Sequence, residues 1–297
     1  MSVQLYQHAV VLVERLRPRC ARRSPGEPGP RDERDLRQDH GVTSVDIPST
    51  AVLLPGTGSD EVFVRAVFER PLAALGIRVV APPPPQGDAV VTGSLALLDR
   101  IAEETGESLV VGGVSLGAHL AAEWAIRNTH RCAGVLAALP AWNGSGETAP
   151  AAVAATVSAD LVDRHGLDEA LAVSTRGVAP WLAEELTRAW RRHGSSLAAG
   201  LRAAARHPAP ELDDLGALTV PVGVAACVDD PVHPAATART WVEALPNAAL
   251  VETSLTALGA DRESLGRATA LAWLRARAAD EPGTTGPSRH HRPARPR

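Results

Sequence analysis

Residues 109–120 read Leu-Val-Val-Gly-Gly-Val-Ser-Leu-Gly-Ala-His-Leu, an apolar run that passes through glycines into an alanine-rich helical pattern. Within this stretch, residues 113–117 match the pattern G-x-S-x-G between a predicted strand and a predicted helix. The alternative is a chance match in a chain rich in glycine and alanine. In strand–turn–helix context, however, the pattern is typical of a nucleophile elbow, in which flanking glycines prevent collisions with neighbouring backbone. The sequence therefore predicts that Ser115 Oγ is exposed at the carboxyl end of a strand, beside free N–H groups of the next helix.

Strand and helix patterns alternate on both sides of this elbow. The predicted strands are Ala51–Leu54, Ile77–Ala81, Ser108–Gly112, Cys132–Leu139, Val220–Cys227 and Ala249–Thr253. Helices are predicted at about Asp60–Leu75, Ala89–Glu104, Leu116–Arg127, Pro234–Leu245 and Asp261–Ala279. Short apolar strands interleaved with helices are typical of a parallel sheet that is covered on both faces. The predicted fold class is therefore α/β, with a mostly parallel sheet between two layers of helices.

The composition divides the chain into parts. Residues 46–140 and 216–279 carry the alternating pattern and form the predicted α/β core. Residues 141–215 contain several helical patterns and no strand, which predicts a helical lid inserted between two strands. Residues 1–45 and 280–297 are rich in arginine, proline and glycine, so disorder is expected there, with a true translation start near Val42 as the alternative for the first segment.

Composition also excludes several classes of protein. The net charge is −4, and no aromatic residues are interleaved with the arginines, which argues against nucleic-acid binding. All 30 basic residues are arginine, a bias typical of a GC-rich bacterial genome. The 3 cysteines are widely spaced, so neither a disulfide framework nor a metal site is expected. No signal peptide and no apolar stretch long enough to span a membrane is found, and we expect a cytoplasmic protein.

The chain resembles the α/β-hydrolase superfamily over roughly residues 49–279. The resemblance is carried by the turn at residues 53–58 (Leu-Leu-Pro-Gly-Thr-Gly), the elbow, the helical insertion and residues 229–234 (Asp-Asp-Pro-Val-His-Pro). It implies an oxyanion hole made by the backbone N–H groups of Thr57 and Leu116. It also implies that Asp230, four residues before Pro234, is the catalytic acid. Asp230 could instead, or in addition, cap the helix that begins at Pro234.

The family pattern also requires a histidine after the last strand, and here the chain departs from it. Residues 253–262 read Thr-Ser-Leu-Thr-Ala-Leu-Gly-Ala-Asp-Arg, with Gly259-Ala260 where Gly-His is usual. A serine hydroxyl without a base is a poor nucleophile at neutral pH. The departure therefore leaves open whether the chain is active and which residue replaces the histidine.

Two histidines lie close in sequence to the predicted site. His233 follows Asp230 by three residues, in the loop expected to face the active-site edge, and is our candidate base. Its alternative is a surface position at the start of a helix. His119 lies one helical turn after Ser115, where packing beneath the elbow helix is the simpler expectation.

Three functions remain open. The first is a serine hydrolase of a small ester or thioester, acting through an acyl-enzyme on Ser115, with Asp230 orienting His233. The second is a catalytically impaired hydrolase-fold protein that binds a small molecule or a protein partner. The third is a non-hydrolytic enzyme that uses Asp230 or His233 as a general base.

The expected partner is a small acyl substrate, without nucleic acid, membrane, cofactor or metal. Asp229, Asp230 and His233 could hold a cation, but an ordinary loop is the simpler interpretation. The apolar helices of the insertion could cover either a pocket or another subunit. Three tryptophans in the insertion could line such a pocket or pack in a core: Trp142, Trp181 and Trp190.

Overall fold

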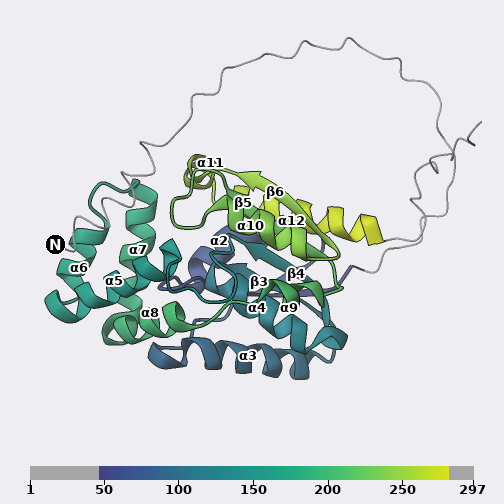
Figure 1. Cartoon of the computed structure of the whole chain (residues 1–297), viewed down its shortest axis with the longest axis horizontal. Coiled ribbons are helices and arrows are strands. Elements are labelled where there is room, and N and C mark those ends of the chain that lie inside the picture. Colours follow the sequence, from purple (N-terminus) through teal and green to yellow (C-terminus); the bar gives the residue numbers. More distant parts are fainter. Residues whose placement is uncertain (1–46, 281–297) are drawn as a thin grey trace, which may run out of the picture. The chain divides into compact units, whose positions relative to one another are not determined.

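The computed structural model describes residues 47–280, and its centre is a six-stranded sheet with the order β2-β1-β3-β4-β5-β6 (Figure 1). All neighbouring strands are parallel. The strands are β1 (Thr50–Leu54), β2 (Arg78–Val80), β3 (Leu109–Val114), β4 (Cys132–Ala138), β5 (Val222–Cys227) and β6 (Ala248–Thr253). The predicted fold class is confirmed. The predictions of disorder and of a start near Val42 concern residues outside the described part of the chain.

Helices cover both faces of the sheet because the central strands are apolar on both sides. In β1, Val52 and Leu54 face one hydrophobic core, whereas Ala51 and Leu53 face the other. The first core is closed by α3 (Val90–Thr105), α4 (Leu116–Arg127), α9 (Leu212–Gly216) and α10 (Ala235–Ala244). The second core is closed by α2 (Glu61–Ala73), α11 (Leu255–Ala260) and α12 (Glu263–Asp280). This two-sided burial is the reason for the short, continuous apolar strand patterns.

The structure corrects the predicted end of β3 and adds two short helices. β3 continues through Gly112 and Gly113 to Val114, where the prediction ended it at Gly112. Glycine weakens an isolated strand, but here it is required by close neighbours: a Cβ on Gly112 would lie 2.4 Å from Leu136 O, and one on Gly113 would lie 2.2 Å from Leu54 O. Helices α9 and α11 were not predicted, because five or six residues are too short to show a helical period.

The direction in which the strands are added reverses at β1. The chain passes from β1 outward to β2 and then returns to β3 on the other side of β1. In open parallel sheets, ligands bind at the carboxyl ends of the strands beside such a reversal, because the two following loops diverge there. The loop after β1 contains Thr57 and the loop after β3 contains Ser115, so both lie at this position.

The helical insertion, residues 141–215, follows β4 and returns to β5. Its helices α5 (Pro150–His165), α6 (Leu167–Ser174), α7 (Pro180–His193) and α8 (Leu197–Arg206) lie together at one end of the sheet (Figure 1). They form a small core of their own that includes Ala159, Leu171 and Trp190. The insertion is thus held together by its own apolar contacts and meets the sheet at one end.

Helix α7 is attached to the loop that follows β1. Arg188 binds both carboxylate oxygens of Asp60, with Nε 2.9 Å from Oδ2 and Nη2 2.7 Å from Oδ1. His193 Nε2 also lies 3.0 Å from Ser59 O. Burial raises the pKa of the Asp60 carboxyl, but the hydrogen bonds and charge of Arg188 and the N–H of Phe63 hold this pKa below its ordinary value. A charged carboxylate buried here requires such a partner, so Arg188 couples the insertion to the loop of Thr57.

Within residues 47–280, no helix is both long and apolar enough to cross a bilayer.

Candidate active site

Ser115 occupies the sharp turn between β3 and α4. Its backbone has φ 55° and ψ −114°, and its N–H donates to Ala138 O at 2.9 Å. Ser115 and Leu139 are the non-glycine residues with positive φ in the described part of the chain, and they follow neighbouring strands. Strain of this kind persists only where the surroundings enforce it, and it is concentrated at functional sites. The structure therefore contains the turn geometry that the sequence indicated, but Ser115 is buried, with 7% of its surface exposed, so the prediction that it is exposed is wrong.

His233 lies between Ser115 and Asp230. Its Nε2 is 3.0 Å from Ser115 Oγ, and its Nδ1 is 2.9 Å from Asp230 Oδ2. The side chains of His233 and Asp230 are 18% and 6% exposed, and Ser115 is 7% exposed. The three side chains thus form one largely buried chain of hydrogen bonds, in which the imidazole faces the hydroxyl on one side and the carboxylate on the other.

The hydrogen bonds of Asp230 keep its carboxylate charged and fix its orientation. Oδ2 faces His233, while Oδ1 accepts the backbone N–H groups of Val232 at 2.8 Å and His233 at 3.0 Å. Burial raises the pKa of the Asp230 carboxyl, but the charge of His233 and these hydrogen bonds hold the pKa below its ordinary value. Helix α10 begins at Ala235 without a side-chain cap, so the interpretation of Asp230 as its N-cap is wrong.

Two backbone segments that contain the predicted oxyanion donors lie beside the serine. Leu116 is the first residue of α4, where an N–H has no partner within the helix. The loop after β1 passes close to the elbow, since a Cβ on Gly56 would lie 3.4 Å from Ser115 Cβ. Thr57 follows Gly56, and its N–H makes no backbone hydrogen bond with the described residues. Both predicted oxyanion donors therefore lie in segments that flank Ser115.

Asp230 and His233 both lie in the loop between β5 and α10. The chain position where the family usually has histidine lies instead in α11, which ends at Ala260. The sequence signal for this pair was the spacing of three residues between Asp230 and His233. That spacing allows the imidazole to fold back on its own aspartate, but it gives no information about Ser115.

The side chain of His119 is buried in the core and hydrogen-bonds to Ala141. It is 1% exposed, and its Nε2 accepts the N–H of Ala141 at 3.0 Å. Its ring packs against Trp142 and Trp241, with centroids 4.6 and 5.7 Å away. Burial lowers the pKa of the His119 imidazole to about 3, and the charges of His233 and His207 contribute further. His119 is therefore a neutral core residue, as the sequence favoured.

This burial predicts a specific dependence of stability on pH. A histidine whose pKa is depressed in the folded state takes up its proton only on unfolding, so stability falls as the pH drops below the pKa of the unfolded chain, about 6.5. Between pH 6.5 and 4, His119 is expected to lower the free energy of unfolding by about 3 kcal/mol. The depressed pKa values of Asp60 and Asp230 act in a lower window, below about pH 4.

The variant His119→Gln keeps an acceptor for the Ala141 N–H but has no proton to gain. We expect it to be less stable than the wild type near neutral pH and to show a flatter profile between pH 6.5 and 4. Urea unfolding at several pH values measures both profiles. Parallel profiles for the two proteins would contradict the assignment of a neutral buried imidazole.

The tryptophans proposed for a pocket mainly pack in cores. Trp142 and Trp190 are 5% and 4% exposed. Trp190 belongs to the core of the insertion, and Trp142 packs on His119. Trp181 is partly exposed and carries the guanidinium of Arg262 at 4.5 Å from its ring centroid. Of the three, Trp181 is the one that remains accessible, at the contact between α7 and α11.

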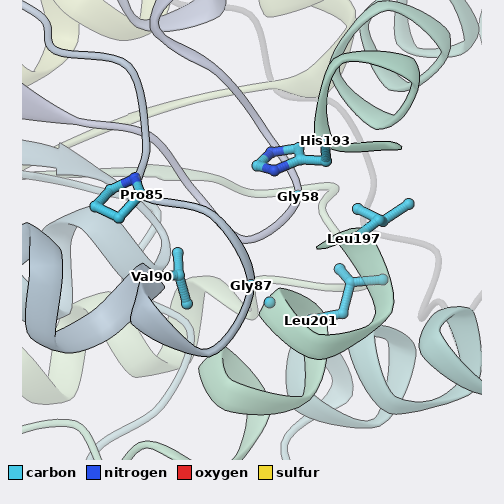
Figure 2. A pocket seen from close by; sticks show the side chains of 8 residues that line it. Gly58, Pro85, Gly87, Val90, His193, Leu197 and Leu201 are labelled. Atoms are coloured by element: carbon cyan, nitrogen blue, oxygen red, sulfur yellow. The ribbon is translucent and has the colours of Figure 1, made fainter. Parts of the chain in front are cut away.

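A small cavity lies between the insertion and the loops after β1 and β2. Figure 2 shows His193, Leu197 and Leu201 on one side of it and Pro85 and Val90 on the other. Its volume is about 10 Å³, close to what a single water molecule needs. Ser115, His233 and Asp230 do not line this cavity. Gly58, in the same loop as Thr57, lines the cavity, but the cavity is too small for an acyl chain.

Metal-ligating side chains do not gather in the described part of the chain. Among residues 47–280, no group of three or more His, Cys, Asp or Glu side chains has the geometry of a metal site. The side chains considered above as a cation site, those of Asp229, Asp230 and His233, are instead engaged in hydrogen bonds within the protein. Asp229 binds the N–H of Leu255, and Asp230 binds His233.

A parallel sheet with a strained serine at its topological reversal, facing a histidine–aspartate pair, defines an α/β-hydrolase fold that carries a Ser–His–Asp arrangement. No family model and no curated protein matches the sequence. Solved structures of this fold do match the chain.

Three similar structures each match about three quarters of the chain. An enol-lactonase from Burkholderia xenovorans LB400 is 19% identical with a TM-score of 0.58, covering 76% of this chain and 91% of its own. An esterase from Thermogutta terrifontis is 20% identical with a TM-score of 0.55, covering 77% and 90%. MenH from S. aureus is 15% identical with a TM-score of 0.55, covering 77% and 95%. The resemblance to the α/β-hydrolase superfamily is thereby confirmed at the level of the fold.

Proposed function

We propose that the protein is a serine hydrolase of small esters or thioesters and that Ser115 forms the acyl-enzyme. The observation that carries the proposal is the hydrogen-bonded chain from Ser115 Oγ through His233 to Asp230. A nucleophile and a base within hydrogen-bond reach, with the base oriented by a third group, is the geometry that nucleophilic acyl transfer requires. The similar structures described as an enol-lactonase and an esterase support ester chemistry at such a site.

In the first half of the reaction, Asp230 accepts the Nδ1–H of His233, which leaves the lone pair of Nε2 facing the serine hydroxyl. Nε2 takes the hydroxyl proton as Oγ attacks the acyl carbonyl, and the N–H groups of Thr57 and Leu116 stabilise the resulting oxyanion. The imidazolium is stabilised by the charged Asp230. It then gives its proton to the leaving alkoxide or thiolate, and the acyl group stays on Ser115.

In the second half, water replaces the leaving group. His233 Nε2 takes a proton from the water as its oxygen attacks the acyl-enzyme, and the same two N–H groups hold the second oxyanion. The proton then passes to Ser115 Oγ as the carboxylic acid departs. Each step uses a group within the hydrogen-bonded chain or next to it.

A fluorophosphonate probe together with a series of short acyl esters tests the proposal. Wild type is expected to be labelled and to hydrolyse at least one short ester, and Ser115→Ala is expected to lose both activities. Ser158→Ala is the matched control, because Ser158 is buried to a similar degree, 8% exposed against 7%, but lies in α5. It is expected to behave as wild type.

The other outcomes assign a different function. Absence of labelling and of hydrolysis in the wild type would overturn the proposal in favour of a binding protein. Turnover of a substrate that survives Ser115→Ala would overturn it in favour of a non-hydrolytic enzyme with Asp230 or His233 as base.

A further inference from the structure

The position of His233 depends on a single loop, residues 228–234. In the usual arrangement of this superfamily, acid and base come from loops after two different strands. Here both come from the loop that joins β5 to α10. An error in the conformation of this loop therefore displaces the acid and the base together relative to Ser115, which lies on a separate segment. The loop needs contacts outside itself to hold the 3.0 Å distance to Ser115 Oγ.

Asp229 supplies such a contact. Its Oδ1 accepts the backbone N–H of Leu255, the first residue of α11, at 2.6 Å. The preceding residue, Val228, donates its N–H to Thr253 O at 3.0 Å, which extends the pairing of β5 with β6 by one step. The two contacts attach the start of the loop to the chain that follows β6.

The two adjacent aspartates point to different partners. Asp230 binds His233 and the N–H groups within the loop, whereas Asp229 binds the N–H of Leu255 across from it. A charge-assisted hydrogen bond to an unpaired N–H at the start of a helix is among the stronger polar contacts available to a carboxylate. Asp229 thus links residues 228–234, which we call the acid–base loop, to the segment where the superfamily usually has its histidine.

We propose that Asp229 is a positioning residue, which holds residues 228–234 against α11 and thereby holds His233 Nε2 in reach of Ser115 Oγ. The expected loss of kcat rests on the proposed function, whereas the expected loosening of residues 228–234 does not. Displacement of a catalytic group by about 1 Å costs on the order of 100-fold in rate. Loss of the Asp229 contact is therefore expected to lower kcat and leave the binding of substrate largely intact.

The test compares three variants in the full-length protein. Asp229→Ala removes the acceptor and is expected to lower kcat toward a short acyl ester by about 10- to 100-fold, with KM changed by less than about 3-fold. Asp229→Asn keeps an oxygen at the position of Oδ1 and is expected to restore kcat to within about 3-fold of wild type. Recovery by asparagine distinguishes the hydrogen bond from the charge.

Ser254→Ala is the matched control for α11 itself. Ser254 Oγ caps this helix by accepting the N–H of Ala257 at 3.1 Å, and it makes no hydrogen bond to the acid–base loop. The variant is expected to lower thermal stability while kcat stays within about 3-fold of wild type. If Asp229→Ala lowers kcat no more than Ser254→Ala does, Asp229 serves only α11 and the proposal is overturned.

Amide hydrogen exchange decides the structural part without any substrate. The N–H groups of Val232 and His233 are expected to exchange faster in Asp229→Ala, and not in Ser254→Ala, because their acceptor Asp230 lies in the loosened loop. Unchanged exchange in Asp229→Ala overturns the proposal. A wild type that neither reacts with the fluorophosphonate probe nor turns over esters removes the proposed function instead, and the exchange experiment still decides the role of Asp229.

Discussion

Replacement of His233 by alanine is expected to lower kcat/KM toward a short acyl ester by about 10⁴- to 10⁶-fold, with the fold intact. In the proposed mechanism the imidazole, whose Nε2 lies 3.0 Å from Ser115 Oγ, is the base, so its loss leaves the hydroxyl without one. The backbone N–H groups of Thr57 and Leu116, which we propose as the oxyanion hole, remain in this variant and are expected to support the residual rate. Steady-state kinetics and the rate of fluorophosphonate labelling measure the loss.

His207→Ala is the control for this experiment. His207 has the same side-chain exposure as His233, 18%, and also pairs with a carboxylate, since its Nε2 lies 2.7 Å from Glu123 Oε2. Its side-chain hydrogen bond is to Glu123 and that of Ser115 Oγ is to His233, so replacement of His207 is expected to leave kcat/KM within about 3-fold of wild type. A loss below about 10-fold for His233→Ala, or an equal loss for both variants, would reject His233 as the base.

The second large effect concerns the elbow. Replacement of Gly117 by alanine is expected to lower the free energy of unfolding by more than about 3 kcal/mol. A Cβ at this position would lie 2.2 Å from Leu54 O and 2.9 Å from Pro55 O, so either β1 or α4 must move. The carbonyls belong to backbone and cannot rotate away as a side chain would. Urea unfolding followed by circular dichroism measures the change.

Gly106→Ala separates this collision from the ordinary effect of glycine replacement. Gly106 has φ 65° at the end of α3, and nothing lies within 4 Å of its potential Cβ. Alanine at this position meets no neighbour but must adopt a left-handed backbone, which should lower the free energy of unfolding by about 1 kcal/mol. A destabilisation by Gly117→Ala no larger than that of Gly106→Ala would show that β1 does not press on the elbow as the structure indicates.

Local patterns accounted for most elements of the fold. The six strands and the longer helices appeared as apolar runs and helical periods, since each of these elements carries its own burial pattern in consecutive residues. Helices α9 and α11 did not appear, because their stability comes from caps and from packing on the core. Ser254 caps α11, and the buried side chain of Leu258 packs this helix on the second core.

The residues of the candidate site also differ in how far the sequence indicated them. Ser115 was recognisable because its requirements lie within five consecutive residues, two of them glycines that must meet β1 at close range. Asp230 was expected from the resemblance to the superfamily, whose acid its spacing to Pro234 matches. The anchoring role of Asp229 had no sequence signal, since its partner Leu255 is 26 residues away.

The sequence by itself determined the parallel sheet and the elbow serine, because both follow from short-range periodicity or from the steric needs of adjacent residues. The loop of Asp230 was expected only from the resemblance to the superfamily. The sequence favoured His233 over His119 as the candidate base, but it carried no information about which imidazole lies near Ser115. Only the tertiary structure showed which imidazole lies beside the serine, by bringing Nε2 of His233, 118 residues away along the chain, to 3.0 Å from Ser115 Oγ. The physical reason is that parallel pairing gathers the carboxyl ends of β3 and β5 at one edge, whereas α4 turns His119 inward to the core.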